Sequence, residues 1–154
     1  VNKFTIGKVE IELTEPDWDP DPEVPMVPTE TYEKDPQITN IGDNNAWVYM
    51  EVVIPRANII TANADGSKNQ RAIVDLFTYS VNKGWTLLNE KVENDKVTRV
   101  YYYNAELKPT ETTPALFDEV TFVNAIEGQQ LENTRIIFYN SYKSCFIFYL
   151  FNYV

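Results

Sequence analysis

The segment KDPQITNIGDNNAWVYMEVVIP, Lys34 to Pro55, decides the fold class of this chain. Its second half alternates strictly, and a period of two over that length predicts a strand with one face in a core. Before this strand, the run IGDNN contains residue types that tolerate left-handed backbone. We therefore predict a hairpin, with a short strand, a tight turn and a longer strand ending at Pro55. The residues predicted to be buried are Ala46, Val48, Met50, Val52 and Ile54.

The composition favours an all-β domain. The chain has 154 residues, of which 44% are hydrophobic and 14% aromatic, and this is enough for one core. The abundant Tyr, Val, Thr, Ile and Phe suit a pleated, half-buried surface, whereas capped amphipathic helical runs are hard to find. We predict a single domain over residues 1–154, built as a two-sheet antiparallel β-sandwich.

The net charge, the lack of histidine and the single cysteine disfavour several classes of function. A net charge of −10 and a pI of about 4.4 disfavour binding to nucleic acid or to anionic lipid. No run of eighteen or more apolar residues is free of polar interruptions, so we predict no membrane span. The chain lacks histidine, the commonest zinc ligand and general base. Cys145 is the single cysteine, which excludes an internal disulfide.

Several segments outside the central one are also interpretable. Residues 14–36 contain six prolines and many acids, so we predict an acidic, Pro-rich surface loop. Asp65-Gly66 is a turn signal. The second half of Ile73 to Val81 and the segment Glu119 to Ala125 are expected to be strands. In the latter, Val120 and Phe122 share a face.

A long hairpin is expected further along the chain. Its strands are predicted at Trp85 to Leu88 and Val97 to Tyr103, with Asn94-Asp95 near the tip. The atypical aromatic tail, residues 136–154, allows three interpretations. It could form two final strands, seek a membrane or a partner protein, or result from a shifted reading frame.

Three pieces of sequence occur in a particular order: VNKFTIGKVEIELTEP (Val1 to Pro16), Lys34 to Val53, and Thr112 to Val123. Together they resemble the camelysin/TasA-like family of SipW-dependent exported proteins of Gram-positive bacteria. The resemblance covers about half of the chain and includes no catalytic signature. After about Thr134 the sequence departs from the family pattern.

The resemblance implies a jelly-roll-like sandwich that is secreted and retained at the cell surface or in the extracellular matrix. Some members polymerise into biofilm fibres by passing an N-terminal strand to the next subunit, and others have been described as metallopeptidases. We expect a structural subunit without enzymatic activity, whose partners are further copies of itself and components of the envelope or matrix. The alternative is an adhesion module that binds glycan or protein. A camelysin-like metallopeptidase ranks third.

Two sets of residues are candidates for binding. Asp17, Asp19 and Asp21 alternate on an extended segment and could converge on calcium, the one cofactor that the sequence leaves open. A solvated acidic loop is the competing interpretation. Val9, Ile11 and Leu13 share one face of the first predicted strand and could fill pockets when this strand adds to a neighbour's sheet edge. An ordinary first strand is the alternative there.

Other chemistry finds little support in the sequence. The acid pairs Asp118/Glu119 and Glu90/Glu93 would need a cleft to act as a glycosidase. The serines have no histidine partner; they are Ser67, Ser80, Ser141 and Ser144. If an adhesion module is correct, exposed rings could stack on sugars, and the candidate rings are Trp18, Trp47 and Trp85. Packing in the core is the alternative, and it is the commoner fate of Trp in a sandwich.

Overall fold

The computed structural model describes residues 11–14, 27–126, 129, 134–141 and 145–152. The regular secondary structure of these residues consists of β-strands alone. The all-β prediction is confirmed for these residues. No helix long and apolar enough to cross a membrane occurs in the part of the chain that is described. The strands are β1 (Ile11–Thr14), β2 (Thr31–Glu33), β3 (Gln37–Asn40), β4 (Tyr49–Ile59), β5 (Ala72–Asp75), β6 (Phe77–Thr78), β7 (Trp85–Val92), β8 (Lys96–Tyr103), β9 (Glu119–Phe122), β10 (Thr134–Ser141) and β11 (Cys145–Asn152).

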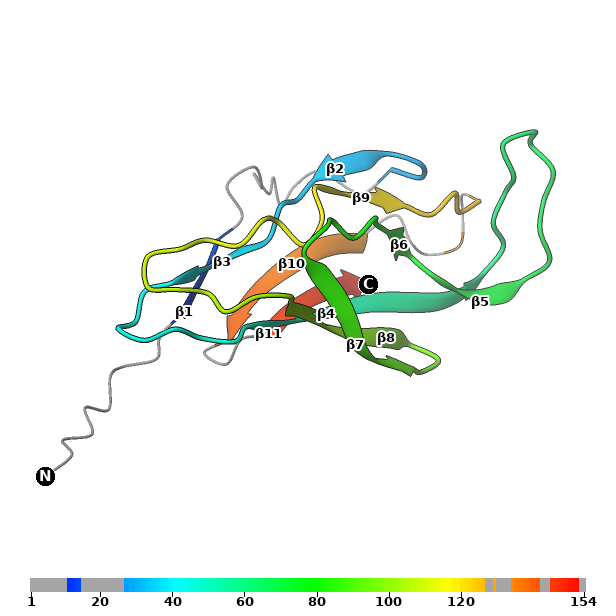
Figure 1. The fold of residues 1–154 in the computed structure, drawn as a ribbon. Helices are drawn as coiled ribbons and strands as arrows, with labels where there is room; N and C mark the ends of the chain where they lie inside the picture. Colours follow the sequence, from blue (N-terminus) through cyan, green and yellow to red (C-terminus); the bar gives the residue numbers. More distant parts are fainter. Residues whose placement is uncertain (1–10, 15–26, 127–128, 130–133, 142–144, 153–154) are drawn as a thin grey trace, which may run out of the picture.

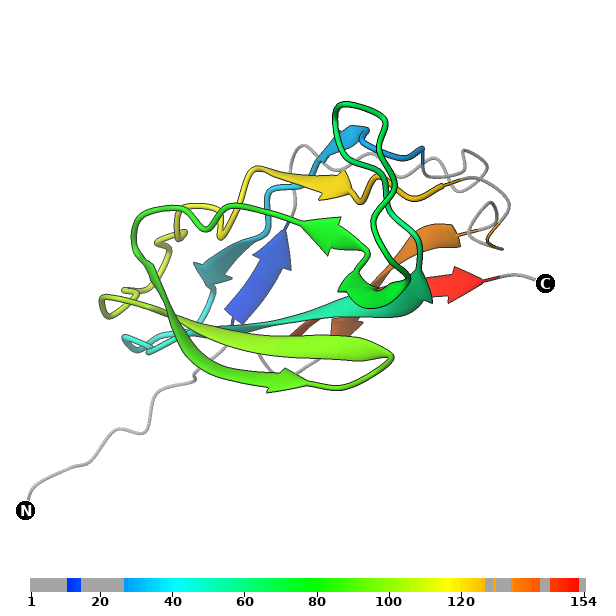
Figure 2. The same cartoon turned by 90° about the vertical axis from the view of Figure 1, so that its right-hand side faces the viewer.

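The strands are arranged in two antiparallel layers (Figure 1). One layer is the four-stranded sheet β5-β4-β8-β7, and the other contains the three-stranded sheet β2-β9-β6. Figure 2 shows β4, β8 and β7 on one side of the core and β2, β9 and β6 on the other. Two antiparallel pairs, β1–β3 and β10–β11, complete the fold, and β11 lies alongside β4. The predicted two-sheet antiparallel architecture is confirmed.

The core-facing side of β4 agrees with the alternation in the sequence. All five residues predicted to be buried lie in the core, and Met50, Val52 and Ile54 are completely inaccessible. Burying an apolar side chain of this size stabilises the fold by roughly 1.5–3 kcal/mol. On the opposite face Trp47 and Tyr49 are exposed. Val53 is buried on that face too, which the alternation does not predict.

The strand does not end at Pro55 as the sequence indicates. β4 continues to Ile59 and changes its partner at the proline, pairing with β8 from Tyr49 to Pro55 and with β5 from Arg56 to Ile59. Proline has no N–H to give to a ladder, so a change of partner is a position where a strand tolerates it. The Pro55 carbonyl still takes part in a backbone hydrogen bond, which it accepts from Leu76 N–H at 2.9 Å.

The predicted hairpin between β3 and β4 is wrong. β3 pairs with β1, whereas β4 pairs with β8 and β5, so the run IGDNN connects two separate sheets. None of these five residues has a positive φ angle. Instead, the side chain of Asn40 holds the chain where it turns from β3 toward β4, and we call this turn the corner. Its Nδ2 donates to the carbonyls of Asn44 and Leu107, both at 2.8 Å, and its Oδ1 accepts from Gly42 N–H at 2.9 Å.

The predicted surface loop of residues 14–36 is corrected at both ends, and residues 15–26 of it lie outside the described residues. Thr14 is the last residue of β1. Thr31–Glu33 form β2, which pairs with β9 at the edge of its sheet, a place compatible with the nearby prolines. Lys34, Asp35 and Pro36 are buried. The sequence could not reveal this, because charged residues are buried only where the surrounding tertiary structure provides interactions for them.

The β7–β8 hairpin has longer strands and a shorter turn than predicted. β7 extends to Val92 and β8 begins at Lys96, so NEKV belongs to the strand. Asn94-Asp95 lies at the tip as expected, and Glu93 N–H donates to the Lys96 carbonyl at 2.8 Å to close the turn. A register shift between Leu87 and Asn89 marks a β-bulge.

The other local predictions are mostly confirmed. Gly66 has a φ of 85°, and Ser67 N–H donates to Asp65 Oδ1 at 2.9 Å, so the Asp65-Gly66 turn is correct. Val120 and Phe122 are both buried, and β9 ends at Phe122. In the segment Ile73 to Val81, β5 makes the first half a strand as well, whereas β6 covers only Phe77–Thr78 of the strand predicted in the second half.

The aromatic tail forms a hairpin. β10 and β11 pair from Thr134↔Asn152 to Ser141↔Cys145, which agrees with the interpretation of this tail as two final strands. Because β11 lies alongside β4, the hairpin is placed against the four-stranded sheet.

Replacing Asn40 with alanine is expected to destabilise the fold by about 2–4 kcal/mol, because Gly42 N–H and the carbonyls of Asn44 and Leu107 would each lose a hydrogen bond. Urea unfolding measures this change. The matched control is Asn44→Ala, because the exposed Asn44 contributes its backbone carbonyl to the corner. A loss below about 0.5 kcal/mol in Asn40→Ala would show that the corner does not depend on this side chain.

Candidate functional site

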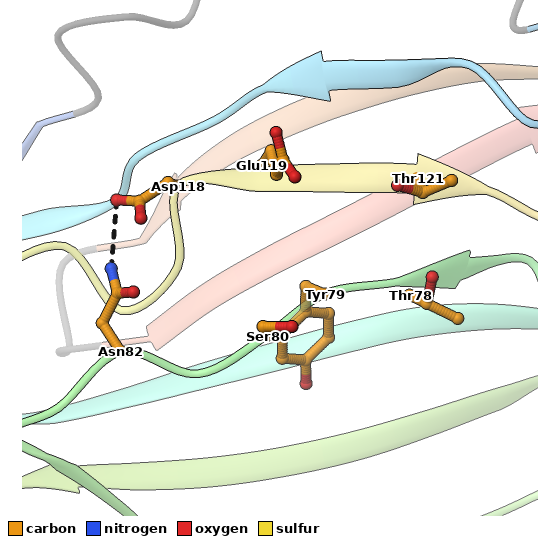
Figure 3. Close-up of a pocket in the computed structure, with 7 residues that line it drawn as sticks. All are labelled: Thr78, Tyr79, Ser80, Asn82, Asp118, Glu119 and Thr121. Carbon is orange, nitrogen blue, oxygen red and sulfur yellow. Dashed lines mark hydrogen bonds between the residues drawn. The ribbon is translucent and has the colours of Figure 1, made fainter.

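A polar hollow lies where the ladder between β6 and β9 opens (Figure 3). The two strands pair at Phe77↔Phe122 and Thr78↔Thr121. The segments that follow β6 and precede β9 meet again at Asn82, whose N–H donates to the Leu116 carbonyl at 2.8 Å. The hollow is lined by Thr78, Tyr79, Ser80, Asn82, Asp118, Glu119 and Thr121.

The two carboxylates of the hollow have different surroundings. Asn82 Nδ2 donates to Asp118 Oδ1 and to the Ala115 carbonyl, both at 3.0 Å, so the Asp118 carboxylate is held by its neighbour. Glu119 points away from Asn82 in Figure 3. The predicted pair Asp118/Glu119 is therefore brought into one hollow, but its carboxylates diverge. A glycosidase needs both to flank one sugar bond.

The second acid pair is engaged in ion pairs. Glu90 Oε2 accepts from Arg99 Nε at 2.7 Å, and Glu93 lies 3.8 Å from the Lys91 ammonium. Of the serines, Ser80 lines the hollow and Ser67 Oγ donates to Asp65 Oδ1 at 2.6 Å. Ser141 ends β10, and Ser144 lies outside the described residues.

Tyr79 belongs more to the core than to the hollow. Its ring packs against Phe117 with the centroids 4.8 Å apart, and its hydroxyl lies 2.8 Å from that of Tyr101. Arg99 NH1 donates to the Tyr79 hydroxyl at 3.2 Å. This cluster joins the segment after β6 to β8.

Arg99 extends the cluster across the four-stranded sheet. Its NH2 donates to Asp75 Oδ2 at 3.3 Å, and Arg56 Nε donates to the other oxygen of Asp75 at 2.8 Å. Partial burial opposes the charge on Arg99, but hydrogen bonds to Glu90 and Tyr79 outweigh it and raise its pKa. Burial and the hydrogen bond to Tyr79 raise the pKa of Tyr101. The cluster thus keeps Arg99 charged and Tyr101 neutral, which is a structural role.

The structure describes only some of the residues predicted to bind calcium or to take part in strand exchange. Asp17, Asp19, Asp21 and Val9 lie outside the described residues, so their roles stay predictions. No group of three or more His, Cys, Asp or Glu that could hold a metal occurs among the residues that are described. Ile11 and Leu13 lie in β1, opposite Asn40 and Ile38 of β3.

The candidate sugar-stacking rings have different environments. Trp85 is buried, and its indole N–H donates to the Pro114 carbonyl at 3.0 Å, so of the two interpretations core packing is the one that holds there. Trp47 is 60% exposed, as predicted. Trp18 lies outside the described residues. The two tryptophans differ because Trp85 occupies a core-facing position of β7 and Trp47 the outer face of the sheet.

β7 presents an exposed edge that the sequence did not reveal. It is the last strand in the order β5-β4-β8-β7, and seven of its eight residues are exposed. Leu87, Leu88 and Val92 are 47%, 56% and 57% exposed. An edge strand with apolar side chains is a template for pairing with another chain. The bulge after Leu87 and the charge of Lys91 are the features by which such edges are usually protected.

Comparison with family models, with curated proteins and with solved structures finds no match to this chain. The resemblance to the camelysin/TasA-like family stays a prediction from the three sequence segments.

Tyr101→Phe is expected to weaken the dependence of stability on alkaline pH. In the wild type the raised pKa of Tyr101 means that the folded state holds this proton more tightly than the unfolded state. The resulting stability is complete below the unfolded pKa of about 10 and is lost as the pH rises above it. Urea unfolding at pH values on both sides of 10 measures this difference.

Val81→Ala is the control for this experiment, since it changes an exposed apolar residue and no titratable group and is expected to leave the slope of stability against pH as it is in the wild type. Equal slopes in the wild type and in Tyr101→Phe would contradict the assignment.

Proposed function

We propose that this chain is a non-enzymatic structural subunit that associates with copies of itself by strand addition at the β7 edge. The exposed edge, with Leu87, Leu88 and Val92 accessible, is the observation that supports this proposal. Strand addition uses the backbone groups of an edge strand for affinity and pockets between its side chains for specificity. β7 is eight residues long, and the bulge after Leu87 leaves Asn89 to Val92 as its longest regular segment for an added strand.

The donor in this proposal is the segment that precedes β1 in a neighbouring copy. Val1 to Glu10 contains ten residues, which span up to roughly 33 Å when extended and can cover an eight-residue strand. Val9 lies in this donor, whereas Ile11 and Leu13 belong to β1. A domain can therefore donate its N-terminal residues while β1 stays paired with β3.

The charge distribution favours the same donor. Copies of a chain with a net charge of −10 repel one another. Val1 to Glu10 contains Lys3 and Lys8 against a single acid, so it is a basic segment in an acidic protein. Adding this segment to another copy brings opposite charges together.

The cellular setting is proposed from the sequence resemblance. A secreted subunit of the cell surface or extracellular matrix would gain from assembly by strand addition, because each joint forms a backbone ladder that does not require a metal or a cofactor. Envelope or matrix components are the proposed further partners.

Deleting Val1 to Glu10 is expected to abolish assembly of the purified protein, because it removes the donor but leaves β1 in place. Leu88→Lys is expected to abolish it as well, because a charge on the accepting edge blocks pairing. Electron microscopy of concentrated protein and sedimentation velocity measure assembly. Assembly in the deletion variant would contradict the proposed donor, and assembly in Leu88→Lys the proposed acceptor.

Val81→Lys is the matched control, because Val81 is an exposed apolar residue outside β7. It is expected to assemble like the wild type. Mixing the two defective proteins adds a sharper test: the deletion variant retains an acceptor and Leu88→Lys retains a donor, so they should form dimers and no longer species.

A further inference from the structure

The outer face of the four-stranded sheet has a group of aromatic rings at one end. Tyr49 of β4 and Tyr102 of β8 are directly opposite each other, so their side chains share a face. Trp47 is two residues from Tyr49 and is on the same side of the chain, between the buried Ala46 and Val48. Trp47 and Tyr49 are 60% and 43% exposed, and Tyr102 is half-buried. We call these three residues the aromatic platform.

The backbone under the platform is held firmly. Ala46 and Leu107 exchange two backbone hydrogen bonds, at 2.9 and 2.8 Å, and Tyr103 N–H donates to the Val48 carbonyl at 3.1 Å. The exposed indole of Trp47 is therefore carried by a chain that is bonded on both sides of it. A large ring exposed on a fixed backbone loses little conformational entropy when it binds a ligand.

Hydrogen-bonding groups lie around the rings. Thr86 of β7 is directly opposite Tyr102 and continues the row from Tyr49 across three strands. Thr86 Oγ1 donates to Asn104 Oδ1 at 2.6 Å, which fixes both side chains. At the Trp47 end, Asn45 Nδ2 lies 3.5 Å from Glu106 Oε2. The rim therefore offers hydroxyl, amide and carboxylate groups.

We infer that the aromatic platform binds a neutral oligosaccharide, with pyranose rings stacked on Trp47, Tyr49 and Tyr102. The C–H groups of a pyranose face carry partial positive charge and are attracted to the negative face of an aromatic ring. The sugar hydroxyls would bond to the rim. This site is independent of strand addition at β7, because it uses the face of the sheet and not its edge.

Charge and size select this class of ligand. The chain is strongly acidic and the rim includes Glu106, so an anionic polysaccharide would be repelled. From the exposed fractions, the three rings present on the order of 300 Å² of surface. A stable protein interface buries about 800 Å² on each partner, so a second protein would need much more than the platform. A short sugar chain needs only the rings and the rim.

Isothermal titration with cellohexaose and chitohexaose tests the inference, with a hexamer of galacturonic acid as the anionic comparison. Binding of at least one neutral hexamer at millimolar concentration is expected. Trp47→Ala and Tyr102→Ala should each weaken it about tenfold, because each removes one stacking ring. Tyr102→Phe retains the ring and should bind nearly as well as the wild type. Val92→Ala, an exposed apolar position on β7, should bind like the wild type.

NMR on the unmutated protein covers the case in which a variant does not fold. The indole N–H signal of Trp47, assigned in the wild type, should shift on addition of the bound hexamer. The inference is overturned if neither neutral hexamer binds, if the anionic hexamer binds better, or if the Trp47 signal does not move. It is also overturned if Trp47→Ala changes the sedimentation coefficient, since a second copy would then be the occupant.

Discussion

The two-residue period of β4 is the constraint on which the rest of this structure depends. The alternation begins at Ala46, three residues before β4, and it points Ala46, Val48, Met50, Val52 and Ile54 into one core and leaves Trp47 and Tyr49 on the opposite face. The buried residues hold the opposite layer in place, because they share a hydrophobic cluster with Leu116, Phe117 and Phe122. A shift of register by one residue would exchange the two faces. The same alternation therefore places the core residues on one face and Trp47 and Tyr49 of the aromatic platform on the other.

β4 also determines which edges are open. It has β8 and then β5 as partners, with the change at Pro55, and these pairings place β7 at the end of the sheet. The proposed acceptor edge is thus a consequence of strand order, not of any motif within β7. The same order aligns Thr86 of β7 with Tyr102 and Tyr49. A strand added at β7 would lengthen the sheet whose outer face carries the platform.

Polar interactions join the strands of this sheet to one another and to the segments around it. Asn40 turns the chain from the β1–β3 pair into β4. Arg99, with Asp75, Glu90 and Tyr79, joins β5, β7, β8 and the segment after β6. The polar groups of these side chains are engaged in hydrogen bonds or ion pairs within the fold. The surfaces that carry the proposals, the β7 edge and the outer face of the sheet at Trp47 and Tyr49, both expose large apolar side chains.

By itself the sequence determined the local properties: the strand character and buried face of the segment ending at Ile54, the turn at Asp65-Gly66, and the shared face of Val120 and Phe122. Alternation and turn chemistry depend on residues close together along the chain, so they can be predicted without knowing the fold. Only the tertiary structure decided which strands pair. It separated β3 from β4, took β4 past Pro55, buried Trp85 while leaving Trp47 exposed, and left β7 at an edge. These outcomes depend on contacts between distant residues, and a strand has the same periodicity whichever neighbour it finds.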